Sequence, residues 1–542
     1  MAKSWLARAR EFISPPAGAP RRALFPRYTR AYNAAEVSRL TMTFTSSDSS
    51  ADSELSQALQ TMRTRSRQLI RNAPFAKRAR EVVVNNVIGT GVGLHAEVMT
   101  ARAEHHDGIN EAIEYAFCEW SRAVNCHTGG ALAFADLERA AFAQIFETGE
   151  CFIRKHHSRF GESEIPLALE LIEAERLVDN FGQAGSPAAG NEIRLGIEVD
   201  RFFRPVAYWI RSSHPGEISF RQDPQKIERV PAVDMFHLRI VTRWPQTRGE
   251  PWLHAVLRKM NDIDGYTEAE ILAARSAACY MGFIESSDEM SGNEEKQDDG
   301  TFQTELSAGI IDRLKPGEKF NFAAPNRPNS SADTFLRFML REMAAGVNVS
   351  YESLSRDYSQ SNYSSSRLAL IEDREVWRTF QKWWIRTFRA ELHRNFVNAA
   401  VLSGAVKIPI AQYAADPAKF YAASFKPRGW AWIDPTKEVE AYSQAVKSGF
   451  VTVADVIAQT GGGTNLEDVL EGRERELELM GAAGLEFLTS PSVYVPEATG
   501  PAPAPAPAST APADPTATDD AAAAVADRAA RLRKLKGWQS GN

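Results

Sequence analysis

Two long helical stretches constrain the fold of this chain more than any other feature of its sequence. One begins at Pro251, which suits the first position of a helix, and can continue unbroken to about Glu285. The other runs from about Ser365 to Ser403 and carries aromatic and aliphatic side chains down one face. At 1.5 Å per residue, these stretches of roughly 35 and roughly 39 residues would reach about 50 Å and about 58 Å. Helices of that length are uncommon in globular domains and indicate a subunit of a larger assembly.

Shorter elements surround the long helices. Apolar spacing of three and four residues predicts helices over about 54–71, 74–88, 109–120 and 132–146, and the glycines of GTGVG stop the second of them. From 150 to about 240, short runs rich in β-branched and aromatic residues alternate with Gly, Pro, Asn and Asp, which predicts a mainly antiparallel β unit. The fold class is therefore α+β.

Composition bounds the class of protein. A chain of 542 residues should form about two to four packing units. It has no apolar stretch long enough to span a membrane and no signal-peptide pattern, so we expect no membrane association and no export. Its net charge of -6 argues against tight gripping of nucleic acid. The four cysteines are scattered without zinc spacing, which favours reduced, mostly buried thiols: Cys118, Cys126, Cys151 and Cys279.

Motifs that carry catalysis are missing. The segment GTGVGLHA has the glycines of a phosphate-binding loop but lacks its lysine, and neither H-E-x-x-H nor G-x-S-x-G occurs. Asp262 and Asp264 stand two apart on a helix, so they face different directions and are interpreted as solvated charges rather than metal ligands. The Trp377–Phe388 aromatic spacing is typical of a core stripe. We predict no catalytic residue, no metal site and no cofactor.

Four segments are predicted to be irregular. Residues 1–54 form a basic, then Ser/Thr-rich arm, and residues 491–542 form a Pro/Ala tail that ends in a basic stub. The segment from 286 to 300 carries many carboxylates and one lysine, which predicts a solvated loop. Residues 348–364 are rich in Ser, Tyr and Asn, and composition alone favours an ordinary solvated connection there. Between the loops and the tail, residues 435–490 are again helical in pattern.

Several segments resemble, in order and spacing, the lambda-type family of phage portal proteins over about residues 55–480. The matching stretches are RSRQLIRNAPFAKRAREVVVNNVIGTGVG, LIEAERL, GIEVDRFFRPVAYWI, QTRGEPWLHAVL, AACYMGFI, NYSSSRLALIEDREVW, DPTKE and VTVADVIAQTGG. The acidic segment 286–300 and the Pro/Ala tail look particular to this chain.

The resemblance implies a portal fold, that is, a ring-forming subunit with an α/β wing, a long-helix stem, a small clip and a helical crown. It implies a ring, typically of twelve subunits, at one vertex of the capsid. Laid onto this chain, it implies the following parts: wing 55–250, first stem helix 251–285, clip 286–330, second stem helix 331–347, tunnel loop 348–364, long wing helix and connection 365–434, and crown 435–490.

The family's roles, carried over by position, make the chain a channel rather than an enzyme. Expected partners are further copies of the chain, double-stranded DNA held weakly and without sequence preference, terminase, the major capsid protein, and head-completion or tail proteins. The expected location is the capsid vertex of the virion, and the host cytoplasm during assembly. Small residues of the first stem helix would face the ring neighbour: Ala273, Ala274, Ala277 and Ala278.

Polar, mostly uncharged side chains of the tunnel loop would face a DNA backbone that carries one charge per ~1.7 Å. They are Ser350, Tyr351, Ser353, Ser355, Arg356, Tyr358, Ser359, Gln360, Asn362 and Tyr363. The alternatives are a nuclease or ATPase component of the packaging machinery, and another head structural protein such as a scaffold. The missing nucleotide and metal motifs disfavour the first, and the two long helices disfavour the second.

Overall fold

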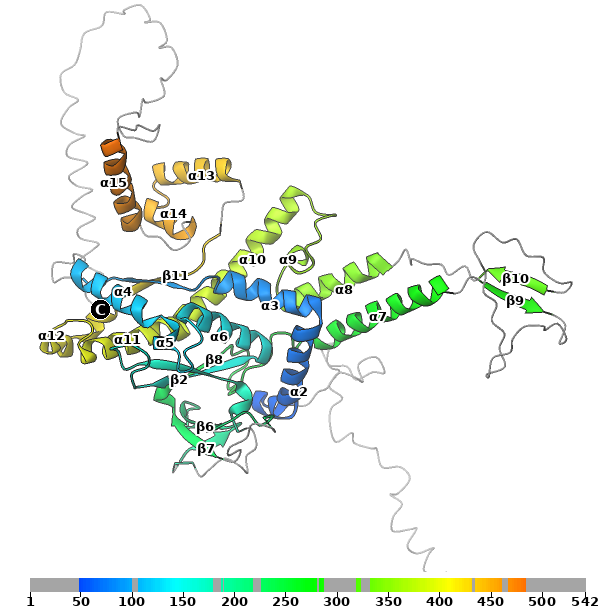
Figure 1. Cartoon of the computed structure of the whole chain (residues 1–542), viewed down its shortest axis with the longest axis horizontal. Helices are drawn as coiled ribbons and strands as arrows, with labels where there is room; N and C mark the ends of the chain where they lie inside the picture. Colours follow the sequence, from blue (N-terminus) through cyan, green and yellow to red (C-terminus); the bar gives the residue numbers. More distant parts are fainter. Residues whose placement is uncertain are drawn as a thin grey trace, which may run out of the picture. The chain divides into compact units, whose positions relative to one another are not determined.

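The computed structural model describes residues 48–99, 106–178, 187–188, 190–217, 226–279, 282–286, 318–322, 332–430, 434–460 and 466–483. The chain divides into two units after Leu466, and helix α15 (Leu466–Ala483) is the described part of the second. The predicted tail, the acidic segment 287–300 and most of the N-terminal arm lie outside the described residues. Figure 1 shows the order of the elements.

Helices α2 (Ala51–Asn72) and α3 (Pro74–Val87) confirm the first two predicted helices. Helix α2 begins three residues earlier than predicted because Ser50 caps it, its Oγ accepting from the backbone N–H of Ser53 at 3.3 Å. Pro74 opens α3, where a missing N–H costs nothing. Gly89 then takes a left-handed φ of 61°, which ends the helix.

Helices α4 (Asp107–Trp120) and α6 (Phe134–Thr148) confirm the next two, and the short α5 (Ala123–Cys126) lies between them. Helix α6 ends at Gly149, whose φ is 91°. A Cβ at that position would overlap the backbone of Glu250, so only glycine fits both the conformation and the close approach.

The β unit is antiparallel, as predicted, and consists of two sheets. Strand β2 (Glu150–His156) lies at the centre of the first, between β3 (Ala168–Ile172) and β8 (Met235–Arg239). The second sheet runs in chain order: β4 (Glu192–Arg194), β5 (Ile197–Val199), β6 (Pro205–Arg211) and β7 (Ile227–Pro231). The run EIRLGIEVD is a hairpin rather than one strand, because the chain turns at Leu195 and Gly196 with φ of 47° and 86°.

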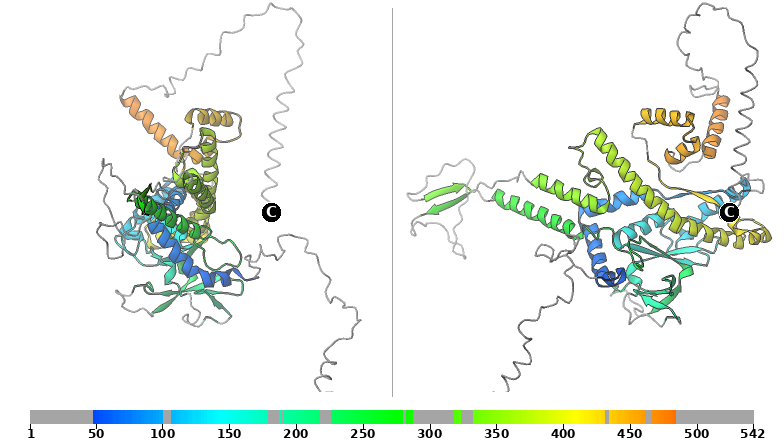
Figure 2. Two further views of the ribbon diagram at one scale, coloured as in Figure 1. Left: turned by 90° about the vertical axis from the view of Figure 1, so that its right-hand side faces the viewer. Right: turned by 180° about the vertical axis from the view of Figure 1, so that it is seen from behind.

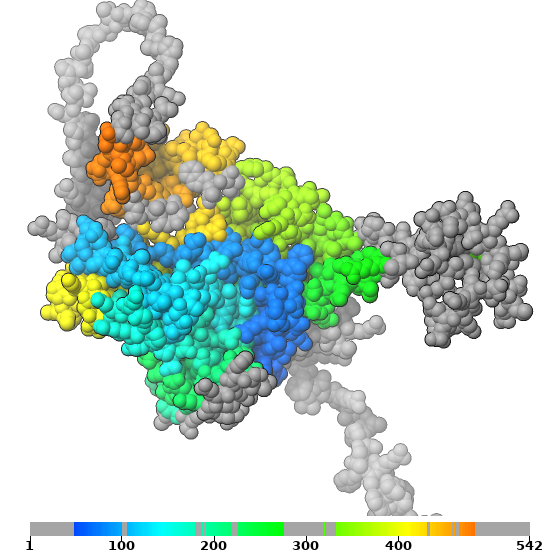
Figure 3. All heavy atoms as spheres, in the orientation of Figure 1, coloured from blue at the N-terminus to red at the C-terminus, as the bar shows by residue number. Residues whose placement is uncertain are grey.

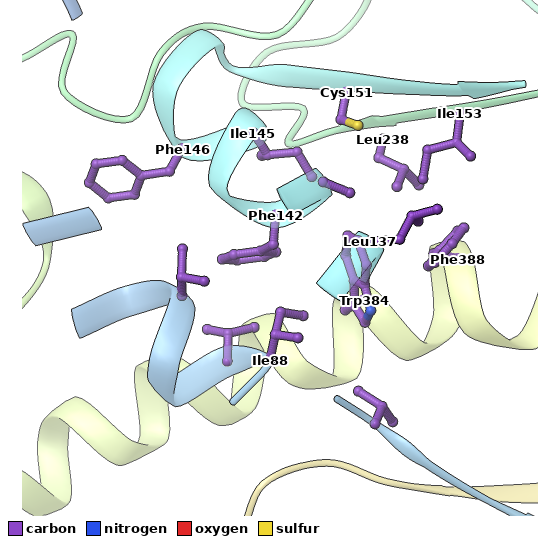
Figure 4. Close-up of a cluster of buried hydrophobic side chains, with 14 of the residues drawn as sticks. Ile88, Leu137, Phe142, Ile145, Phe146, Cys151, Ile153, Leu238, Trp384 and Phe388 are labelled. Carbon is purple, nitrogen blue, oxygen red and sulfur yellow. The ribbon is translucent and has the colours of Figure 1, made fainter. Parts of the chain in front are cut away.

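Alternating side chains of β2 divide the buried residues into two cores. Cys151 and Ile153 face α6, the end of α3, and Trp384 and Phe388 of the second long helix, as the close-up of Figure 4 shows. Phe152 points to the other face, against the second sheet, where its ring centroid lies 5.8 Å from that of Tyr208. The first sheet is thus covered on both faces, which accounts for the three consecutive buried residues Cys151, Phe152 and Ile153 in β2.

Helices α7 (Leu257–Cys279) and α8 (Ala332–Val347) lie side by side in the views of Figures 1 and 2. The second was predicted almost to the residue. The prediction of one helix from Pro251 to Glu285 is wrong at both ends. Residues 252–256 form turns, because the backbone N–H of Trp252 donates to the carbonyl of Phe146 and holds this segment on α6.

At the other end of α7, residues predicted to be helical form strand β9 (Gly282–Ser286), which pairs antiparallel with β10 (Glu318–Phe322). Helix α7 therefore reaches about 35 Å rather than about 50 Å. The other residues of the predicted clip, 287–317 and 323–330, are outside the described ranges.

The second long helix has the predicted length, but its α-helical hydrogen-bond pattern is interrupted by one π-helical turn. It consists of α10 (Tyr363–Trp384), a π-helical turn (Ile385–Arg389) and α11 (Ala390–Ser403), and Gly404 ends it with a φ of 80°. The predicted aromatic stripe is core, as expected: Trp377, Trp384 and Phe388 are buried. The same helix in Figure 1 crosses behind α3 and α6.

The chain beyond Ser403 returns to its beginning. After α12 (Ile410–Ala415) and a 3-10 turn (Pro417–Tyr421), strand β11 (Ala423–Lys426) pairs antiparallel with β1 (Gly93–Ala96). Sequence reasoning missed this two-stranded sheet. Helices α13 (Pro435–Lys447) and α14 (Val453–Thr460), together with α15, confirm the helical pattern of 435–490. The space-filling view of Figure 3 shows α2, α3 and α6 forming one continuous face.

Candidate functional site

The pair of helices α7 and α8 leads to the segment that the sequence marked as a tunnel loop. Lys259 and Glu342 form an ion pair across the pair, and the rings of Tyr266 and Phe335 meet edge to face at 5.2 Å. Gly346 lies so close to Val256 that a Cβ there would clash with its side chain. The two helices are therefore in direct contact along α8.

Both helices leave large apolar side chains in solvent. Leu272 and Phe338 are 62% and 64% exposed, and Ile271 and Phe335 are also exposed. Exposed apolar side chains on both of these neighbouring helices are candidates for contact with another chain.

The four alanines predicted to face a ring neighbour all lie in α7. Ala273 is half-buried and Ala274 is exposed, and both directly follow the exposed Leu272 in the helix. Ala277 and Ala278 fall within the helix, but their side chains lie outside the described residues. The structure leaves their role as an interface untested.

The segment 348–364 is not wholly a loop. Helix α9 (Tyr351–Ser355) occupies its first part, where an irregular connection was expected. Ser350 caps this helix, and Arg356 ends it in a left-handed conformation with a φ of 58°. Leu354 is buried beneath it. The exposed tip of the segment therefore begins only after Ser355.

Neighbouring helices hold α9 at several points. Arg78 of α3 donates to the carbonyl of Ser353 at 3.2 Å. The hydroxyl of Tyr351 donates to Asp357 at 2.7 Å, and Arg337 of α8 lies 3.5 Å from the same carboxylate. Hydrogen bonds from Ser359 and Tyr351 lower the pKa of Asp357 to about 2, so the carboxylate is ionised at neutral pH and pairs with Arg337.

The ten predicted loop residues separate into an inner and an outer group. Ser350, Ser353 and Ser355 use their hydroxyls within the protein, the first two on Asp373 and the third on the carbonyl of Tyr351. Tyr351 is half-buried. The outer, exposed group is Arg356, Tyr358, Ser359, Gln360, Asn362 and Tyr363. Only the outer group presents its side chains to solvent.

A buried ion cluster, which sequence reasoning missed, fixes the base of α7 to the β unit. Glu150 at the start of β2 is fully buried and accepts hydrogen bonds from Arg63 of α2, from Arg248 at 2.8 Å and from the backbone N–H of Gly249 at 3.0 Å. Burial acts to raise the pKa of Glu150, but Arg248 and Arg63 outweigh it and hold that pKa well below its usual range.

His237 of β8 completes the cluster as a neutral imidazole. Burial, with the nearby Arg239, lowers the pKa of His237 to about 3. Its Nε2 donates to Glu150 at 2.9 Å, and its Nδ1 accepts from Arg239 at 2.9 Å. The cluster joins three parts of the chain that are distant in sequence. The signals available in advance were a glutamate, Glu150, directly after the helix-ending Gly149, and an arginine, Arg248, in the segment QTRGEP.

Within the described ranges, no group of three or more His, Cys, Asp or Glu could hold a metal ion. No helix among those residues is long and apolar enough to cross a membrane.

The elements described above are those of a portal-type α+β subunit. They comprise two adjacent helices that run out to a β hairpin, a double-sheet antiparallel unit, and a capped loop held by three helices. Comparison with known proteins then identifies the family. Residues 38–381 match the family described as "Phage portal protein, lambda family". The chain belongs to this family, and the predicted resemblance, fold class and portal function are confirmed.

Named relatives agree. The chain is 28% identical over 459 residues to a probable portal protein of Halomonas phage phiHAP-1, covering 83% of this chain and 86% of that protein. It is 20% identical over 468 residues to portal protein B of Escherichia phage lambda, covering 78% and 84%. Among solved structures it is similar to a chain in the neck of a native gene transfer agent particle, at 12% identity and a TM-score of 0.38 over 73% of this chain and 93% of that one. An HK97-family portal protein from Corynebacterium diphtheriae gives 12% identity and a TM-score of 0.29 over 70% and 98%.

Proposed function

We propose that this chain assembles into a closed ring, of twelve subunits, whose axial channel passes double-stranded DNA into and out of the phage head. Residues 55–250 form the wing, α7 and α8 the stem, and the segment between them the clip. The segment 348–364 lines the channel, 365–434 forms the long wing helix and its connection, and 435–490 forms the crown.

The observation that carries the channel proposal is the composition of the exposed tip. Tyr358, Ser359 and Gln360 are exposed and uncharged, while the nearest acid, Asp357, is paired with Arg337. A wall of this kind can touch a polyanion without releasing its counterions, so it would neither grip nor repel the duplex strongly. Arg356 is the exposed cation of the tip.

The assembly proposal rests on the apolar and small residues of α7 and α8. A ring requires a heterologous interface, in which one face of a subunit meets a different face of the next. The exposed Leu272 and Ala274 of α7 and the exposed Phe338 of α8 would contribute to such a face, since small residues permit close helix approach and large ones bury area.

The ring would act as a passive channel and a docking platform without enzymatic activity. The terminase that drives packaging would dock on the clip, head-completion and tail proteins would replace it, and the wing would meet the major capsid protein. The subunit would assemble in the host cytoplasm and remain in the virion. No observation favours a nuclease, an ATPase or a scaffold.

Electron microscopy of the purified full chain tests the proposal. We expect rings with an axial hole, twelvefold in class averages, and no ATP hydrolysis or DNA cleavage with magnesium present. Only monomers or open filaments at micromolar concentration, or ATPase activity that copurifies with the rings, would overturn it.

A further inference from the structure

The base of the segment 348–364 rests on one buried carboxylate. Asp373, in the third turn of α10, is 5% exposed. Its Oδ1 accepts the backbone N–H of Ser350 at 2.8 Å, and its Oδ2 accepts the hydroxyls of Ser350 and Ser353, each at 2.7 Å. Burial raises the pKa of Asp373, and the hydrogen bonds from Ser350 and Ser353 act to lower it, because hydrogen bonds to an ionised acceptor are about twice as strong as neutral ones. One side chain thus joins the first turn of α9 to α10.

These bonds differ from an ordinary helix cap. Ser350 already caps α9, its Oγ accepting from the backbone N–H of Ser353 at 3.3 Å while it gives its own proton to Asp373. The carboxylate therefore orients the Ser350 hydroxyl that caps the helix. A helix of five residues is far below the length that is stable by itself, so α9 owes its order to such tertiary bonds.

The other contacts of α9 come from α3 and α8, which pack against it more extensively than α10 does. Arg78 of α3 binds its last turn through the carbonyl of Ser353, and Leu354 packs beneath it. Beyond Ser355, the exposed residues lead directly into α10, where Asn362 caps the first turn by accepting from the backbone N–H of Ser365 at 2.8 Å. The tip is consequently held at both ends by α10, by Asp373 at one end and by the chain itself at the other.

We propose that Asp373 is the positioning residue of this segment. In addition to the packing of α9 on α3 and α8, it ties the first turn of α9 to α10 and so fixes the base of the exposed tip. The anchoring stands on the contacts alone; its consequence for DNA rests on the proposed function, in which the tip lines the channel.

Hydrogen–deuterium exchange on assembled rings tests the anchor directly, comparing Asp373→Ala with Glu372→Ala. Glu372 is its exposed neighbour on the same helix and serves as the matched control. We expect the amides of 351–356 to exchange about tenfold to a hundredfold faster in the Asp373 variant, as loss of charged hydrogen bonds predicts. The control should match the unmodified ring, and α8 should keep its protection in both.

A second pair of variants covers the case in which Asp373→Ala fails to fold. Replacing Ser350 and Ser353 together by Ala should reproduce the faster exchange, whereas replacing both by Thr keeps the hydroxyls and should restore protection. Unchanged exchange at 351–356 in Asp373→Ala, or equal exchange in the Ala and Thr pairs, would overturn the anchoring role.

A DNA-packaging assay with the same rings separates the anchor from the channel. Faster exchange together with altered packaging rate supports both. Faster exchange with an unaltered rate leaves Asp373 as the anchor and overturns the placement of this segment in the channel.

Discussion

Replacing Glu150 by Gln should destabilise the chain more than any surface change, because it removes the one carboxylate in a buried cluster of cations. Arg63 and Arg248 have side chains that are 2% and 0% exposed, and both bind Glu150. Glutamine has the same size but offers a single neutral acceptor to them. Breaking a buried ion pair by removing one partner costs about 3–5 kcal/mol, since the charges left behind stay desolvated.

The assay is urea unfolding followed by tryptophan fluorescence, with Glu228→Gln as the control. Glu228 pairs with Arg154 on the surface of the β unit, where its side chain is 53% exposed, so its loss should cost about 0–1 kcal/mol. We expect the Glu150 variant to lose at least about 3 kcal/mol of unfolding free energy. A loss as small as that of the control would refute the reasoning that the cluster is a desolvated ionic joint.

The same cluster predicts how stability depends on pH. His237 has a folded pKa of about 3 against 6.5 for the free side chain, so the unfolded chain binds more protons between these values. The pKa of Glu150 is also depressed in the folded chain. Both groups therefore contribute stability that is present above pH 6.5 and is lost as the pH falls, first through His237 and below about 4.5 through Glu150. His237→Gln should flatten the profile between pH 6.5 and about 4; an unchanged slope there would show that another group controls it.

Two further predictions concern assembly and the channel. Ala274→Trp should leave a soluble monomer that forms no rings in size-exclusion chromatography, because the bulky indole overpacks against the neighbouring subunit. The control, Ala131→Trp at another exposed alanine, should assemble normally. If both variants form rings, that face of α7 lies away from the subunit interface. Lysines at three exposed tip positions should slow packaging at low salt: if only about three phosphates engage, the salt slope rises by ~2.7, so adhesion should fall about 40-fold between 50 and 200 mM salt. Asparagines at the same positions should package normally, and a lysine variant with unaltered packaging at low salt contradicts the channel placement; the three positions are Tyr358, Ser359 and Gln360.

Local signals in the sequence sufficed for most of the helices. The apolar pattern predicted the end of the long helix at Ser403, and α8 was bounded within one residue, because 3.6-residue periodicity acts over a few neighbouring positions. The antiparallel β unit and the absence of known catalytic motifs were equally readable. Family resemblance, carried by several segments in order, identified the portal function.

Tertiary contacts decided the rest. By its sequence, helix α7 could begin near Trp252. It starts instead at Leu257, because Trp252 donates its indole N–H to the carbonyl of Val347 and its backbone N–H to the carbonyl of Phe146. The segment after Cys279 is a strand because a partner, β10, completes its hydrogen bonds. A short apolar run is compatible with a helix or a strand, and only the tertiary contacts of the run decide which one forms.

The functional details depend on long-range contacts even more strongly. Glu150 meets Arg63 and Arg248 across 87 and 98 residues, and Asp373 meets Ser350 across 23. In the sequence each of these is an isolated polar residue that could equally well lie on the surface. Burial makes these residues important for stability, because a charge removed from water must be paired within the fold. The sequence alone does not show which residues the fold will bring together.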